Sequence, residues 1–328
     1  MDTIYLDNAA TSFPKPEGVS DRMKYYLDCV GANVNRSVYT AAQEAGMTTL
    51  ALRQRLASLF RFPEMPTHVI LTPGATAGLN MIISGLLHGG GHCIVSSMEH
   101  NAVMRPLLRL PGVEVSRIPC GSDGIADIDA LPGLFRPDTK LVIMAHASNV
   151  CGAVQDAAAV GRICGERGVP FALDAAQTAG HLPIDFQALG LAAMAVPGHK
   201  GLLGPGGVGA LLLRHDFAEK LTPLIAGGTG SASDSEYLPP YLPDRFESGT
   251  ANIPGYYGWE AALRFIEERG VDTLRQHEMA LCRRFLDGLE DIPHVRMVGP
   301  RELERRVGVI SVDFLRRDNG EAAYALET

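Results

Sequence analysis

Short apolar runs alternate along the chain with longer segments in which apolar residues recur at helical spacing. The short runs are rich in β-branched residues, and we predict strands at residues 68–72, 92–97, 113–118, 140–147, 170–175, 192–196 and 208–214. The predicted helices cover residues 17–27, 41–60, 75–87, 101–108, 128–134 and 157–167. Such alternation is typical of a mostly parallel sheet covered by helices, so the pattern predicts an α/β fold.

The pattern changes in the last quarter of the chain. Residues 255–289 read as helix with a break near Gly270, and two short strands at 296–298 and 308–314 follow. These elements predict a smaller α+β unit. The expected organisation is an N-terminal segment (1–15) near the small unit and the site entrance, a large unit (16–254), and a connecting helix with an incomplete small unit (255–328).

Composition excludes several classes of partner and location for the protein. With 328 residues and 46% hydrophobic content, the chain can bury a large core. A net charge of -8 without a basic tract argues against a nucleic-acid partner. We expect no membrane span and a cytoplasmic location, because no apolar run is long enough and no export signal is seen. Six cysteines without CxxC pairs indicate neither a metal site nor disulfides, so small molecules are the expected ligands.

The most specific polar feature is Lys200, which lies in a glycine-rich turn from Gly198 to Gly209. A partly desolvated lysine beside other positive groups has a lowered pKa, which favours formation of a Schiff base. A surface lysine on a glycine-rich loop is the alternative. A dinucleotide site at residues 204–209 is disfavoured, because these glycines precede a strand instead of following one.

Two further clusters could bind the ends of a phosphorylated ring. The turn at Pro73 and Gly74 leads into a helix, where the N–H groups of Ala75 and Thr76 and the Thr76 hydroxyl would bind a phosphate. Asp174 ends a buried strand, where it would keep a pyridine nitrogen protonated. The alternatives are an ordinary helix cap and a buried acid that caps the next helix.

Three more polar residues follow predicted strands. His100 could lie over a planar ligand, Gln177 could face a phenolic oxygen, and Asn149 could bond the ring oxygen or the substrate. Singly, such residues are more often structural. Together with Lys200 and Asp174 they indicate a pyridoxal-phosphate site at the ends of the strands.

The order of these motifs resembles that of fold-type I pyridoxal-phosphate enzymes of the class V aminotransferase group. In particular it is similar to the cysteine desulfurase and selenocysteine lyase branch, from Ile4 to about Phe314. The motifs that carry the resemblance are Tyr5–Thr11, Thr72–Thr76, Glu99–Asn101, Ser148–Val150, Asp174–Gln177, Gly198–Lys200 and Arg245–Asn252.

The resemblance implies a role for each ring contact. Lys200 would bond covalently to pyridoxal phosphate and move the substrate's α-proton, and His100 would stack on the ring as a second catalytic residue. Asp174 would pair with the pyridine nitrogen, Gln177 would bond the phenolic oxygen, and Asn149 would bind the ring or substrate.

The same resemblance assigns the phosphate to Ala75, Thr76 and His199, and it implies a homodimer in which Thr250 reaches the phosphate of the neighbouring subunit. The activity implied is removal of sulfur from L-cysteine, leaving L-alanine and a persulfide. A sulfur-acceptor protein and a place in sulfur metabolism, including iron–sulfur cluster assembly, would follow.

Several positions depart from the family pattern. Pro197 replaces a hydroxyl residue, Ala77 replaces a glutamate, and Asn35 and Tyr39 stand where relatives often have histidine. Residues 7–10 and Arg36 resemble parts of the substrate entrance.

The family's nucleophilic cysteine and its carboxylate-binding arginine would lie beyond Thr328, so we expect a chain that is truncated at its C-terminal end. Cys282 does not match the position of the nucleophile, and Cys151 is expected near the cofactor without an assigned role. Transamination, epimerisation, β-elimination, selenocysteine cleavage and a fragment without desulfurase activity therefore stay open as alternatives.

Overall fold

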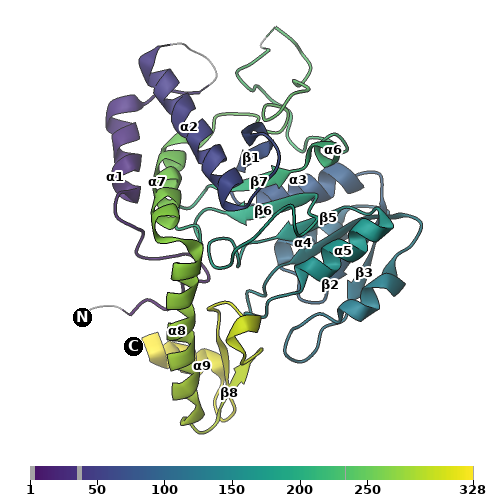
Figure 1. The fold of residues 1–328 in the computed structure, drawn as a ribbon, viewed down its shortest axis with the longest axis vertical. Coiled ribbons are helices and arrows are strands. Elements are labelled where there is room, and N and C mark those ends of the chain that lie inside the picture. The colour runs from purple at the N-terminus through teal and green to yellow at the C-terminus, as the bar shows by residue number, and fades with distance from the viewer. Residues whose placement is uncertain (1–3, 35–38, 233, 328) are drawn as a thin grey trace.

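A seven-stranded sheet forms the centre of the computed structural model, which describes residues 4–34, 39–232 and 234–327 (Figure 1). In spatial order its strands are β1 (Val69–Thr72), β7 (Gly209–Leu213), β6 (Ala193–Pro197), β5 (Phe171–Asp174), β4 (Thr139–Ala145), β2 (Gly91–Ser96) and β3 (Val113–Ile118). Strand β7 runs antiparallel to both neighbours, and the other pairings are parallel. The predicted mostly parallel α/β fold is confirmed.

Helices cover both faces of this sheet (Figure 1). The α-helices are α1 (Val19–Tyr25), α2 (Thr40–Leu59), α3 (Ala75–Leu87), α4 (Asn101–Arg109), α5 (Ala157–Arg167), α6 (His215–Ala218), α7 (Ile253–Arg269), α8 (Val271–Glu290) and α9 (Asn319–Glu327). Short 3-10 helices occur at η2 (Pro66–His68), η3 (Ile128–Leu134) and η4 (Leu303–Arg305), and α1 continues into a π-helical turn, η1 (Tyr26–Val30). The helix expected at 128–134 is thus a 3-10 helix, and Pro132 inside it has no N–H to donate.

Alternate residues of the buried strands face two apolar layers. Ile70 and Val95 pack with α3 and α4 on one face, whereas Leu71 and Ile94 belong to the cluster that includes α2, α5 and α7 on the other. Strands buried on both faces read as continuous apolar runs, which is why short apolar runs in the sequence located them.

A smaller unit lies beyond α7. Helix α8 begins directly after Gly270, whose φ of 79° lies in the left-handed region that favours glycine, as the predicted break requires. Strands β8 (Val295–Val298) and β9 (Ser311–Phe314) pair antiparallel, and β9 begins later than the predicted strand at 308. The division at residues 15/16 and 254/255 stays a prediction. None of the helices in the described ranges is long and apolar enough to cross a membrane.

Candidate active site

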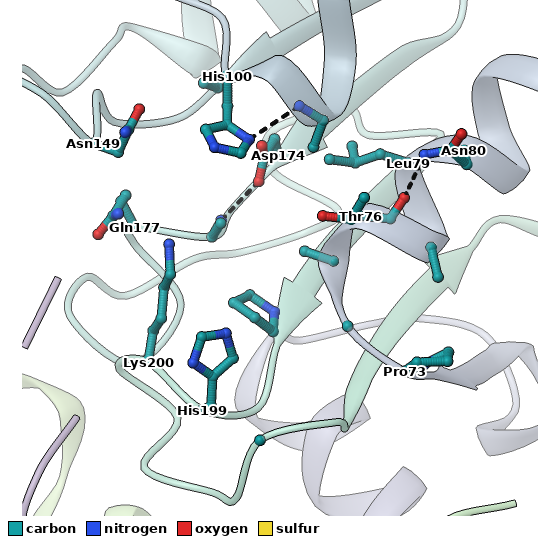
Figure 2. A pocket seen from close by; sticks show the side chains of 18 of the residues that line it. Pro73, Thr76, Leu79, Asn80, His100, Asn149, Asp174, Gln177, His199 and Lys200 are labelled. Carbon is teal, nitrogen blue, oxygen red and sulfur yellow. Dashed lines mark hydrogen bonds between the residues drawn. The ribbon is translucent and has the colours of Figure 1, made fainter. Parts of the chain in front are cut away.

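The carboxyl ends of the parallel strands meet at one edge of the sheet, where ligands of open α/β sheets bind. A cavity of about 700 Å³ opens at this edge. Figure 2 shows the predicted residues around this one space. It brings together eight of the nine predicted cofactor contacts, namely Ala75, Thr76, His100, Asn149, Asp174, Gln177, His199 and Lys200.

Lys200 follows β6 in a tight turn closed by hydrogen bonds. The Gly204 N–H donates to the Gly198 carbonyl at 2.7 Å, and the Leu203 N–H donates to the Lys200 carbonyl at 2.8 Å. The Lys200 side chain extends into the cavity toward Gln177 (Figure 2). Burial lowers the pKa of Lys200, and the Asp174 carboxylate opposes this effect only in part. A larger fraction of the amine is therefore neutral and able to attack a carbonyl carbon.

Asp174 ends β5 and is 4% exposed. Its Oδ1 accepts a hydrogen bond from the Ala176 N–H at 2.9 Å. Burial raises the pKa of Asp174, while that hydrogen bond and the nearby His100 and Lys200 lower it. A buried carboxyl with remaining acceptor capacity is well suited to a protonated ring nitrogen.

His100 is the N-cap of α4, and its Nδ1 accepts a hydrogen bond from the Ala102 N–H at 3.0 Å. The neutral ring therefore carries its proton on Nε2. The preceding residue, Glu99, accepts bonds from the N–H groups of Ser96 at 3.2 Å and Ala145 at 2.9 Å, so it joins the ends of β2 and β4. Burial raises the pKa of Glu99 to about 8, although the hydrogen bonds from Ser96 and Ala145 act to lower it.

The other end of the cavity is suited to a phosphate. Helix α3 begins at Ala75 after the N-cap Gly74, so the first N–H groups of α3, including that of Thr76, have no partner within the helix. A Cβ at Gly209 would lie 2.5 Å from the Gly74 Cα, so only glycine lets β7 approach this turn. Burial lowers the pKa of His199, and the charges of Lys200 and Lys15 lower it further.

Some predicted residues lie elsewhere. Thr250 is exposed and lines a neighbouring cavity of about 510 Å³, which shares Pro73 and Gly207 with the first. Its role toward a neighbouring subunit stays a prediction. Arg36 and Asn35 lie outside the described residues.

The departures from the family pattern divide between the cavity wall and the surface. Pro197 and Ala77 line the cavity, so both changes lie where the cofactor is expected. Tyr39 is exposed and does not line the cavity.

The six cysteines are free. Cys151 is 2% exposed, with its Sγ 3.8 Å from the Asp123 carbonyl oxygen, and Cys282 is buried in α8. The expected proximity of Cys151 to the cofactor does not make it a wall residue, because the loop from Ser148 folds it inward. Among the described residues, no cysteine lines the cavity and no group of acids, histidines and cysteines is arranged to hold a metal.

The sequence predicts residues 7–10 at the substrate entrance, but it does not predict the individual contacts that the N-terminal segment makes with the site. Lys15 and Ser12 bond the His199 carbonyl oxygen across 184 and 187 positions of sequence, and the Gln177 Nε2 donates to the Ala9 carbonyl at 3.3 Å. No local signal marked Lys15, because its role depends entirely on a distant partner.

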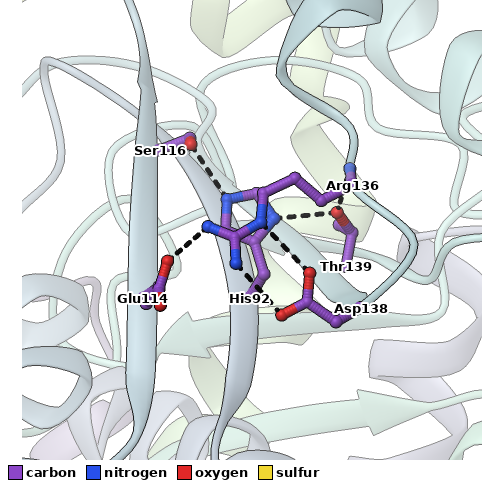
Figure 3. Close-up of polar contacts among 6 residues, drawn as sticks. All are labelled: His92, Glu114, Ser116, Arg136, Asp138 and Thr139. Atoms are coloured by element: carbon purple, nitrogen blue, oxygen red, sulfur yellow. Dashed lines mark hydrogen bonds and ion pairs between the residues drawn. The ribbon is translucent and has the colours of Figure 1, made fainter.

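A second polar cluster lies near the start of β2, at the end of the strand away from His100 (Figure 3). The His92 ring is fully buried and bonds Thr139 Oγ1 at 2.8 Å and Ser116 Oγ at 2.9 Å, and Arg136 pairs with Asp138 beside it. Burial lowers the pKa of His92, and the Arg136 charge adds to this effect. Every ring nitrogen has a partner, so the cluster joins strands and is not a second site.

The lysine, the buried carboxyl and the helix N-terminus fit one cofactor. A phosphorylated pyridine aldehyde needs an amine, an acid for its ring nitrogen and an anion site, and one cavity offers all three. Such a constellation at the carboxyl edge of a mostly parallel sheet defines a fold-type I pyridoxal-phosphate enzyme.

Comparison with known proteins narrows this class. The chain belongs to the aminotransferase class-V family, whose model matches residues 4–328. It is 32% identical over 323 residues to a probable cysteine desulfurase of Pyrococcus abyssi, covering 95% of this chain and 78% of that protein. A cysteine desulfurase of Klebsiella pneumoniae is 33% identical over 321 residues, with the same coverage.

A solved structure supports the same family assignment. The apo cysteine desulfurase of Thermococcus onnurineus superposes with a TM-score of 0.92 at 30% identity, over 99% of this chain and 82% of that one. The fold and the family of the chain, and with them its dependence on pyridoxal phosphate, are therefore shown.

Proposed function

We propose that the chain is a pyridoxal-phosphate-dependent desulfurase that converts L-cysteine to L-alanine and transfers the sulfur to a thiol as a persulfide. The observation that carries the proposal is the convergence of Lys200, Asp174 and His100 in one cavity of a chain whose relatives are named cysteine desulfurases.

Each of these residues would bind a different part of the cofactor. Lys200 would hold it covalently, Asp174 its ring nitrogen, and the first turn of α3 with His199 its phosphate. When bound, the cofactor accepts the electron pair left by removal of the substrate's α-proton. Asp174 favours that acceptance because a buried carboxylate keeps the nitrogen protonated.

Lys200 is the group suited to move the proton. Its lowered pKa makes the amine a better match for proton transfer near neutral pH. In the overall reaction the C–S bond of cysteine breaks, an S–S bond forms on the accepting thiolate, and the carbon that lost sulfur gains a proton. Cysteine and a thiol thus give alanine and a persulfide, with atoms and electrons balanced.

The accepting thiolate is proposed to come from outside the described cavity wall, since no cysteine in the described ranges lines it. An acceptor protein or a small thiol would meet this need. The same observation favours a second candidate, β-elimination, in which no protein thiolate attacks. L-cysteine and water would then yield pyruvate, ammonia and sulfide instead of alanine.

The test is product formation from L-cysteine by the purified chain with added pyridoxal phosphate and dithiothreitol. We expect alanine, with loss of both alanine and the cofactor's visible absorbance in Lys200→Ala. Lys220→Ala removes an exposed lysine and serves as the matched control. A Lys200→Ala protein that still forms alanine would refute the assignment, and pyruvate in place of alanine would select the second candidate.

A homodimer is proposed with this function. Thr250 is exposed and outside its own cofactor cavity, so its hydroxyl is available to a second copy. Sedimentation velocity should give a dimer, and Thr250→Ala should weaken cofactor binding. A monomer with full cofactor affinity would refute this part.

A cytoplasmic location and a role in supplying sulfur, including for iron–sulfur clusters, complete the proposal. Cell fractionation and pull-down of a persulfidated acceptor protein check these parts.

A further inference from the structure

One carbonyl oxygen, that of His199, gathers an unusual number of donors from the N-terminal segment. It accepts from the Ser12 N–H at 3.0 Å, the Ser12 Oγ at 3.1 Å, the Thr11 Oγ1 at 3.1 Å and the Lys15 Nζ at 3.0 Å. A carbonyl oxygen offers two lone pairs. The four donors therefore crowd around one acceptor and surround the peptide bond that links His199 to Lys200.

Lys15 is the charged member of this group. Its Nζ also donates to the Ser12 Oγ at 2.7 Å, so the ammonium holds the serine and the carbonyl at once. Lys15 is partly buried, which lowers its pKa, and it makes no ion pair with a carboxylate within the described part of the chain. Its positive charge is thus left to act on the turn it touches.

That charge is positioned beside a cavity residue. The charge of Lys15 lowers the pKa of His199, after burial and the Lys200 charge. The other side of the turn is equally confined, because a Cβ on Gly201 would lie 2.4 Å from the Ala179 carbonyl oxygen. With both sides held, the direction in which Lys200 leaves the backbone is set by these contacts.

We propose that Lys15 is a positioning residue, whose ammonium anchors the His199–Lys200 peptide and keeps a positive charge at the phosphate end of the cavity. This inference rests on the proposed function for its purpose, since the charge would attract a phosphate dianion and the anchor would aim the amine. Lys15 itself does not line the cavity and is not a catalytic residue.

The first test uses the apoprotein and needs no activity. The titration of His199 is followed by NMR, with its resonance assigned by loss in His199→Gln. We expect the pKa of His199 to rise in Lys15→Met, to stay unchanged in Lys15→Arg, and to stay unchanged in Ser12→Ala, which removes only neutral contacts. An unchanged value in Lys15→Met, or an equal rise in Ser12→Ala, would overturn the charge role.

The second test measures binding of pyridoxal phosphate to the apoprotein. Loss of a charge-assisted contact at the phosphate end should raise the Kd about tenfold in Lys15→Met, with recovery in Lys15→Arg. Equal affinity of Lys15→Met and wild type would overturn the anchoring role. Lys15→Gln, neutral but still able to donate, gives a second charge-free variant if the methionine variant does not fold.

The two proposals fail separately. If wild type forms no alanine, the desulfurase function is refuted while the His199 titration still tests Lys15. If alanine forms and the titration does not change, only the role of Lys15 is refuted.

Discussion

His146 should make the stability of the fold sensitive to mild acid. The residue follows β4 and is 7% exposed, with its N–H bonded to the Asp174 carbonyl and its Nδ1 3.0 Å from Thr178 Oγ1. Burial lowers the pKa of His146 from 6.5 to about 4. The folded protein thus holds the ring neutral at a pH where an unfolded chain protonates it.

The sign and size of this pH effect on the free energy of unfolding follow from proton linkage. Because the folded pKa is depressed, the stabilisation is fully present above pH 6.5 and is lost as the pH falls toward 4. Each pKa unit corresponds to about 1.4 kcal/mol, so the full effect is about 3 kcal/mol. Between pH 7 and pH 5, His146 alone should remove about 2 kcal/mol of stability.

Urea unfolding of the apoprotein measures this change, with the fluorescence of Trp259 as the signal. Trp259 is the only tryptophan of the chain and is fully buried in α7. His146→Asn cannot take up the proton, so its free energy of unfolding should fall by about 2 kcal/mol less than that of wild type between pH 7 and pH 5.

A matched control removes the partner and keeps the titrating ring. Thr178→Val should be less stable than wild type at every pH and should still lose stability in acid. Parallel pH profiles for wild type and His146→Asn would refute the reasoning.

Two further changes test the site itself. Asp174→Asn keeps the shape of the side chain but removes its charge, and an opposite charge shifts a pKa by about 1 to 3 units. We therefore expect kcat to fall by about 10- to 1000-fold, with the far-UV circular dichroism unchanged. An unaltered kcat would contradict the role of Asp174. Gly201→Ala would place a Cβ 2.4 Å from both the Ala179 carbonyl oxygen and His181 Cδ2. Thermal unfolding should then show a loss of about 1 to 3 kcal/mol of stability, together with weaker cofactor binding. A wild-type Tm would show that the turn can relax.

Local sequence was sufficient to predict which residues of single elements line the cavity. A strand followed by a glycine turn and a helix predicted the anion site at Ala75 and Thr76, and a charged residue at a strand end predicted Asp174. Lys200 was identified by its turn. These features depend on periodicity, capping and turn geometry, which neighbouring residues determine.

The strand order and the antiparallel direction of β7 were decided by packing between segments far apart in the chain. So were the bridge that Glu99 makes from β2 to β4 and the contact of Lys15 with His199. Periodicity, capping and turn chemistry act over a few residues, so they fix the chemistry at each strand end. The free energy of a distant contact depends on how the whole chain buries its apolar surface, and only the tertiary structure holds that information.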